Sequence, residues 1–161
     1  MEISLQKAQT EACKQIHEMQ IRAFAELLNK YKDYSTNPAA ETIEKIEQRM
    51  AQEFTDYHFI CLDGNHIGVI RIMKLKDDTC RISPMFIEPE FQGKGYAQQA
   101  ILKAEILYSK AKHWTLDTIK QEAKLCYLYE KMGYRATGKE ETIKDGMTLI
   151  YYAKDAISLL F

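Results

Sequence analysis

The feature that most constrains this chain is a glycine-containing loop between a hydrophobic segment and an amphipathic one. The segment before the loop, residues 81–87, is rich in β-favouring side chains, and Pro89 after it has no N–H to donate to a neighbouring strand. After the loop, apolar residues recur at the spacing of one helical face: Ala97, Ala100, Ile101, Ala104 and Leu107. The sequence therefore predicts a strand that ends near Ile87 and a helix that begins near Gly95 and ends near Lys112.

The loop leaves backbone N–H groups accessible at the start of this helix. The first turn of a helix carries N–H groups without intrahelical partners and the positive end of the macrodipole. Gly93 and Gly95 have no side chains, so an anionic oxygen can approach closely, and pyrophosphate is the expected ligand. The alternative is a tight turn that only needs positive φ. A dinucleotide fingerprint would need glycine in place of Gln98, and a triphosphate-binding loop would need Gly-Lys-Ser or Gly-Lys-Thr; neither is present.

The loop motif is Gln92-Gly93-Lys94-Gly95-Tyr96-Ala97, which resembles the Q/R-x-x-G-x-G/A motif of the GCN5-related N-acetyltransferase (GNAT) family. That family uses the motif to hold the pyrophosphate of acetyl-coenzyme A. The resemblance implies that acetyl-CoA is the cosubstrate and that its pyrophosphate binds residues 92–97. It also implies that the pantetheine arm pairs, like an added strand, with the backbone of Met85, Phe86 and Ile87.

A second match is Leu128-Tyr129-Glu130-Lys131-Met132-Gly133-Tyr134, which is similar to the family's closing motif L-Y-E-K-x-G-F. The family tyrosine commonly faces the coenzyme sulfur and protonates the departing thiolate, so the resemblance gives this role to Tyr129. The alternative is that Tyr129 is a core aromatic on a helical stripe. The family often has Asn seven residues before the tyrosine, in contact with the coenzyme arm, and this chain has Glu122 there.

Periodicity and turn signals predict the element order βααβββαβαββ. The expected helices are 10–28, with Thr10 as N-cap, 39–52, 95–112 and 122–132. The expected strands are 3–7, 57–62, 67–75, 81–87, 114–119, 134–142 and 147–153. The resemblance implies the same order and a mixed sheet splayed between its fourth and fifth strands. The predicted fold class is α/β (an α+β mixed sheet), with residues 1–161 as a single domain, because a chain of 161 residues can build one core.

Acetyl transfer needs a neutral amine, donors for the oxyanion and a proton for the thiolate. The resemblance favours direct transfer in a ternary complex. An alkyl ammonium has a pKa of about 10.4, so some group must first remove a proton. Asp117 and Glu88 lie near the predicted splay and are the candidate bases, although either could instead cap a neighbouring helix. Cys126 is the alternative nucleophile, but no histidine has a recognisable pairing with it.

The candidate acceptor residues lie between the first two helices. Tyr31, Asp33 and Tyr34 belong to a loop that borders the acceptor pocket in the resembled family, and Asp117 should approach from the sheet. Aromatic faces and carboxylates suit a cationic amine. The expected acceptor is therefore a positively charged small-molecule or peptide amine. The alternative is that Asp33 and its neighbours only cap and solvate a loop.

Composition argues against several other partners. The 22 basic and 23 acidic residues give a net charge of −1 without a run of five like charges, so neither nucleic acid nor an anionic membrane is an expected partner. The absence of a basic leader or an apolar stretch of 18 residues predicts a cytoplasmic protein. The cysteines, which should be reduced, are Cys13, Cys61, Cys80 and Cys126. The histidines, which lack metal-ligand spacing, are His17, His58, His66 and His113.

The predicted activity is acetyl-CoA-dependent N-acetylation of a primary amine. Two alternatives are a non-catalytic domain that senses acetyl-CoA and a structural domain whose glycine loop is only a turn. The intact Tyr129 favours the enzyme over the sensor. The oligomeric state stays open, with a homodimer as one option.

Overall fold

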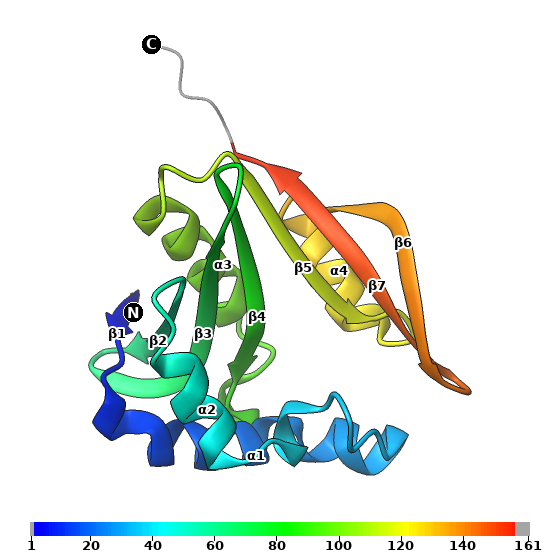
Figure 1. The fold of residues 1–161 in the computed structure, drawn as a ribbon, viewed down its shortest axis with the longest axis horizontal. Helices are drawn as coiled ribbons and strands as arrows, with labels where there is room; N and C mark the ends of the chain where they lie inside the picture. Colours follow the sequence, from blue (N-terminus) through cyan, green and yellow to red (C-terminus); the bar gives the residue numbers. More distant parts are fainter. Residues whose placement is uncertain (1, 157–161) are drawn as a thin grey trace.

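A seven-stranded sheet runs through residues 2–156, which are the residues that the computed structural model describes (Figure 1). Its strands are β1 (Ile3–Lys7), β2 (Thr55–Leu62), β3 (Asn65–Leu75), β4 (Thr79–Ile87), β5 (His113–Ile119), β6 (Arg135–Lys144) and β7 (Met147–Asp155), in the spatial order β1-β2-β3-β4-β5-β7-β6. The helices are α1 (Cys13–Tyr31), α2 (Ile43–Met50), α3 (Tyr96–Leu107) and α4 (Ala123–Lys131). Short 3-10 turns are η1 (Thr10–Ala12), η2 (Pro38–Ala40) and η3 (Pro89–Phe91). The predicted fold class and element order are confirmed.

The parallel pair at the centre of the sheet is short. β4 and β5 pair only over Thr79–Arg81 and His113–Thr115, and beyond these residues the two strands diverge (Figure 1). Every other pair of neighbouring strands is antiparallel. The predicted splay between the fourth and fifth strands is confirmed, and we use "the splay" below for the region between residues 82–87 of β4 and 116–119 of β5.

Helices cover the two faces of the sheet with separate apolar clusters. On one face, α3 and α4 pack against the strands, and the cluster includes Ile101, Ala104, Trp114, Tyr129 and Tyr152. On the other face, α1 and α2 pack against the N-terminal strands, and the cluster includes Ile16, Met19, Ile46, Tyr57 and Phe86. α1 crosses the lower edge of the sheet and reaches toward its C-terminal half (Figure 1). None of the helices within residues 2–156 has the length and apolar character needed to cross a bilayer.

Two predicted helix starts were wrong because local turns precede the helices. Thr10 is not the N-cap of α1, since Thr10–Ala12 forms a 3-10 turn and Ala12 takes the cap position. The second helix does not start at Ala39, because Pro38–Ala40 forms a separate turn. α2 starts only after Thr42, whose hydroxyl accepts a hydrogen bond from the Lys45 N–H at 3.3 Å.

The predicted end of α3 near Lys112 was also wrong. The helix ends at Leu107, and Tyr108 leaves the helical conformation with φ −101° and ψ 51°. The Tyr108 hydroxyl donates to Asp56 at 2.7 Å and lies 2.7 Å from His58 Nε2, both on β2. These tertiary hydrogen bonds involve residues about 50 positions earlier in the chain, so helical periodicity did not reveal them.

The orientation of α3 can be tested with two isoleucines. Ile101 is 0% exposed, and Ile101→Ala should lower the free energy of unfolding by about 2–5 kcal/mol through lost burial and a residual cavity. Ile106 on the same helix is 71% exposed, so Ile106→Ala is the matched control and should change stability by no more than about 0.5 kcal/mol. Equilibrium unfolding in urea measures both, and equal losses would contradict the assigned orientation.

Candidate active site

The glycine loop presents open backbone at the start of α3. Gly93 and Gly95 have φ of 78° and 82°, in the left-handed region that favours glycine, and Gly95 is the N-cap of α3. A Cβ built on either glycine would meet no atom within 4 Å, so the space beside the backbone is free. Gln92 Nε2 donates to the Ile87 carbonyl at 2.8 Å and ties the loop to the end of β4. The loop therefore has the geometry expected for an anion site at a helix N-terminus.

The predicted coenzyme-arm strand has a free edge. Residues Met85, Phe86 and Ile87 pair with β3 on one side only. On the other side, β5 has already diverged, so within residues 2–156 this edge has no strand partner. Backbone groups on such an edge remain available to an extended ligand.

Tyr129 lies on α4 and packs in the core beside the splay. Its ring contacts Tyr134 edge to face, with centroids 6.3 Å apart, and its side chain is almost fully buried. Burial, followed by the charges of Asp117 and Cys126, raises the pKa of the hydroxyl, so the proton is retained at neutral pH. Tyr129 thus belongs to the core cluster and still holds a proton that it can donate.

Asp117 on β5 is bound by a cation from β4. The Arg81 guanidinium donates to its carboxylate across the splay, just beyond the last paired residues. The same guanidinium lies 5.8 Å from the ring centroid of Tyr151, which is the cross-strand neighbour of Asp117 on β7. Asp117 is therefore at the predicted place, and its charge is balanced by Arg81.

Glu88, the other candidate base, follows the last residue of β4. Arg22 on α1 donates to both of its oxygens, at 3.0 and 2.9 Å. The Glu88 N–H donates to the Ile67 carbonyl at 2.8 Å. This two-point contact anchors α1 to the end of β4, which gives Glu88 a structural role whether or not it also takes a proton.

The three acceptor-loop residues do not point the same way. Tyr31 donates from its hydroxyl to Glu122 on the far side of the splay. Asp33, 4% exposed, accepts hydrogen bonds from the N–H and hydroxyl groups of Ser35 and Thr36. Burial opposes ionisation of Asp33, but these hydrogen bonds outweigh it and lower the pKa of the carboxyl group. Asp33 therefore shapes the loop.

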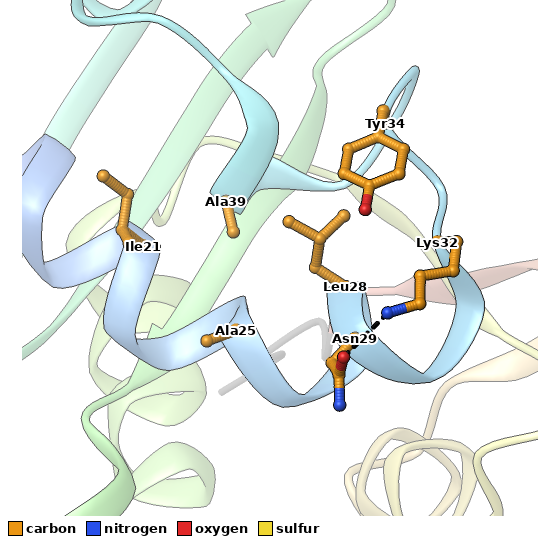
Figure 2. A pocket seen from close by; sticks show the side chains of 7 residues that line it. All are labelled: Ile21, Ala25, Leu28, Asn29, Lys32, Tyr34 and Ala39. Carbon is orange, nitrogen blue, oxygen red and sulfur yellow. Dashed lines mark hydrogen bonds between the residues drawn. The ribbon is translucent and has the colours of Figure 1, made fainter.

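Tyr34 follows the end of α1 and has an exposed side chain. It is 67% exposed and borders a groove of about 200 Å³ between α1 and the following segment (Figure 2). The other lining residues are Ile21, Ala25, Leu28, Asn29, Lys32 and Ala39.

Glu122 joins the two halves of the molecule. It is the N-cap residue of α4, and its carboxylate accepts hydrogen bonds from Lys30 Nζ, at 2.7 Å, and from the Tyr31 hydroxyl. The predicted coenzyme-arm residue and the predicted acceptor loop thus meet at one carboxylate. Sequence reasoning missed the three cations at the site, Arg22, Arg81 and Lys30, because each binds a carboxylate 36 to 92 residues away and follows no local pattern.

The Cys126 thiol contacts backbone carbonyl groups. It lies 3.7 Å from the carbonyl oxygens of Ile119 and Lys120, as a weak donor to the end of β5. All four cysteines are free. In the part of the chain from residue 2 to 156, no group of three or more His, Cys, Asp and Glu side chains could hold a metal ion.

Comparison with known proteins identifies the family. The family model described as an acetyltransferase (GNAT) domain matches residues 7–156. No curated protein matches the sequence significantly. Among solved structures, the spermidine N-acetyltransferase from Vibrio cholerae, in complex with CoA and spermine, has a TM-score of 0.76 and 16% identity, over 96% of this chain and 96% of that chain. The PaiA N-acetyltransferase from Thermoplasma acidophilum, in complex with coenzyme A, has a TM-score of 0.75 and 16% identity, over 94% and 98%.

The ribosomal-protein-S18-alanine N-acetyltransferase from Escherichia coli has a TM-score of 0.75 and 13% identity, over 99% of both chains. These identities are low, so the solved structures establish the fold. The family model, which spans nearly the whole chain, establishes the family. The chain belongs to the GNAT family of acetyltransferases, enzymes that transfer an acetyl group from acetyl-coenzyme A to an amine, as the sequence predicted.

Proposed function

We propose that this enzyme transfers acetyl directly from acetyl-CoA to a positively charged primary amine of a small molecule or a peptide. The observation that carries the proposal is the divergence of β4 from β5. An open glycine loop follows β4, and the buried, protonated Tyr129 lies on α4 beside the diverging strands. A phosphate site, a free strand edge and an acid follow one another along this path. That sequence of groups suits the pyrophosphate, arm and thioester of acetyl-CoA.

In this proposal the coenzyme binds along the splay. Its pyrophosphate lies against the loop and first helical turn formed by Gln92, Gly93, Lys94, Gly95, Tyr96 and Ala97. Its arm pairs with the free edge of Met85, Phe86 and Ile87, and Glu122 borders the arm from the start of α4. The left-handed glycines and the unpaired edge of β4 support these assignments.

The chemistry then proceeds in one transfer. Asp117 accepts a proton from the acceptor ammonium, and the neutral nitrogen attacks the thioester carbon. A backbone N–H of β4 holds the developing oxyanion, the carbon–sulfur bond breaks, and Tyr129 gives its proton to the departing thiolate. Tyr129 is protonated at neutral pH and lies on α4 beside the splay, which supports its role as an acid, and the position of Asp117 on β5 beside the splay supports its role as a base. Glu88 is the alternative base.

The acceptor side is formed by the end of α1 and the loop after it. Tyr31, Tyr34 and Asp117 provide the proposed contacts, and Asp33 acts by fixing the loop. Rings and carboxylates favour a cationic amine over an acidic acceptor. The spermine complex of the Vibrio cholerae spermidine N-acetyltransferase, which shares the fold, agrees with this class of acceptor.

The proposal also covers organisation and location. We take the whole chain, residues 1–161, as one acetyltransferase domain, because the family model and the sheet both span nearly all of it. Four free cysteines suit a reducing compartment, which supports a cytoplasmic location.

The coenzyme site is tested with two glycines that both have positive φ. Gly95→Val should weaken acetyl-CoA binding strongly, because a branched side chain blocks the approach of the pyrophosphate to the backbone. Gly138 on β6 also has positive φ and open space beside it, so Gly138→Val carries similar backbone strain away from the loop and should retain affinity. Calorimetric titration measures both variants. A folded Gly95→Val protein with unchanged affinity would rule out this site.

The acid is tested by Tyr129→Phe, which keeps the ring packing and removes one hydroxyl. Turnover should fall by about 10²- to 10⁴-fold while coenzyme affinity is retained. Tyr127→Phe is the matched control, since Tyr127 lies on the same helix with an exposed side chain, and its turnover should be unchanged. Coenzyme release is measured where chemistry limits the rate. Wild-type turnover in Tyr129→Phe would leave Tyr129 as a core residue, and coenzyme binding without release from any amine would favour the sensor function.

The base is tested by Asp117→Asn, which keeps the shape of the side chain and removes its charge. At saturating acetyl-CoA and neutral pH, kcat should fall by about 10²-fold or more, and it should recover as rising pH deprotonates the amine in solution. Asp155→Asn, at the exposed end of β7, is the control. If kcat stays at the wild-type value, Asp117 is not the base, and a loss of kcat in Glu88→Gln would move the role there.

A further inference from the structure

Glu122 holds an ammonium group that belongs to the chain itself. Lys30 Nζ lies 2.7 Å from its carboxylate, and the same nitrogen lies 5.2 Å from the ring centroid of Tyr31. The Tyr31 hydroxyl donates to the same carboxylate oxygen, which orients the ring beside the charge. A carboxylate next to an aromatic face is the combination that proteins use to bind ammonium groups.

The carboxylate is kept ionised by these contacts. Burial acts to raise the pKa of Glu122, but the hydrogen bonds from Lys30 and Tyr31 outweigh it and lower the pKa below its usual value. The Lys30 side chain that fills the site is 57% exposed, and exposed ion pairs contribute little to stability. Lys30 can therefore leave the carboxylate for water at small cost.

The position of this contact relates it to the acceptor. The Glu122 N–H donates to the Ile119 carbonyl at 3.0 Å, so Glu122 lies directly beyond the end of β5, on the diverged side of the splay. Lys30 and Tyr31 come from the end of α1, which belongs to the other half of the molecule. The contact thus lies where the proposed coenzyme arm and the acceptor loop meet.

A site that selects a cation cannot serve the reacting nitrogen during attack. The nucleophilic amine must lose its proton before it attacks the thioester, and it is then neutral. A carboxylate and a ring that prefer an ammonium group would favour the unreactive form of that nitrogen. The charge that they recognise must therefore lie elsewhere on the acceptor.

We propose that Glu122 and the ring of Tyr31 form a subsite for a second, non-reacting ammonium of a diamine acceptor, and that Lys30 occupies this subsite in the free enzyme. The subsite rests on the proposed function, since it names the acceptor class for that reaction. The acceptor displaces Lys30 and takes over its contacts with the carboxylate and the ring. An acceptor with a single amine gains nothing from them.

The kinetic test compares 1,4-diaminobutane with n-butylamine, which has the same carbon chain and one amine fewer. At saturating acetyl-CoA, the wild-type kcat/KM should favour the diamine by about tenfold or more, the effect of one charge-assisted contact. Glu122→Gln should bring this ratio close to one, and Lys30→Ala should lower KM for the diamine alone because the competing ammonium is gone. Since both amines use the same coenzyme, the ratio cancels any effect of Glu122 on coenzyme binding.

The matched control is Glu140→Gln, because Glu140 forms a similar exposed ion pair with Lys120, at 2.9 Å, outside the subsite. It should keep the wild-type preference for the diamine. If Glu122→Gln does not fold, Tyr31→Leu, which removes the ring and hydroxyl, should also lower the preference. A ratio near one in the wild type, or an unchanged ratio in Glu122→Gln, would overturn the subsite.

Direct binding separates the subsite from the proposed reaction. In calorimetric titrations without acetyl-CoA, 1,4-diaminobutane should bind the wild type more tightly than n-butylamine and lose this advantage in Glu122→Gln. If no amine released coenzyme from the wild type, the acetyl-transfer proposal would fail, and the titration would decide the subsite alone. Equal binding of the two amines, or an advantage that survives in Glu122→Gln, would overturn it.

Discussion

The structure of the site depends on how few residues of β4 and β5 pair. Three residues on each strand form the parallel ladder, and the strands then separate. The rest of β4 keeps one edge against β3, and no strand among residues 2–156 pairs with the other edge. Unpaired backbone groups inside a protein are costly, so an open edge in the middle of a sheet favours a ligand that can pair with it. The extended arm of a coenzyme meets that requirement.

Ion pairs between distant segments hold the two halves around this opening. Arg81 and Asp117 join β4 to β5 near the last paired residues, and Arg22 joins α1 to Glu88 at the end of β4. Farther out, the end of α1 meets the start of α4 through Glu122. The divergence is thus framed by side chains from α1, β4, β5 and α4, and three carboxylates at its border, Glu88, Asp117 and Glu122, have cationic partners.

Local signals predicted most of the fold and the open glycine loop at the start of α3. Apolar periodicity located α3 and α4, and the glycines revealed an N-terminal backbone that is open to an anion. Side-chain hydrogen bonds decided what periodicity could not. Tyr108 ends α3 through its bonds to β2, and Asp33, predicted as an acceptor contact, accepts hydrogen bonds from its own loop. The cations of the site were missed because their partners are far away in the sequence.

Paired charges also decide how such a site can select its acceptor. Since Glu88, Asp117 and Glu122 already have cations, selection by these carboxylates requires one cation to be exchanged for another. Arg22 holds Glu88 through two hydrogen bonds, and Arg81 also lies against the Tyr151 ring; an amine cannot reproduce the planar fork of a guanidinium. Lys30 holds Glu122 through a single ammonium, which another ammonium can replace without changing the geometry. The exchangeable pair is therefore the one that joins α1 to α4.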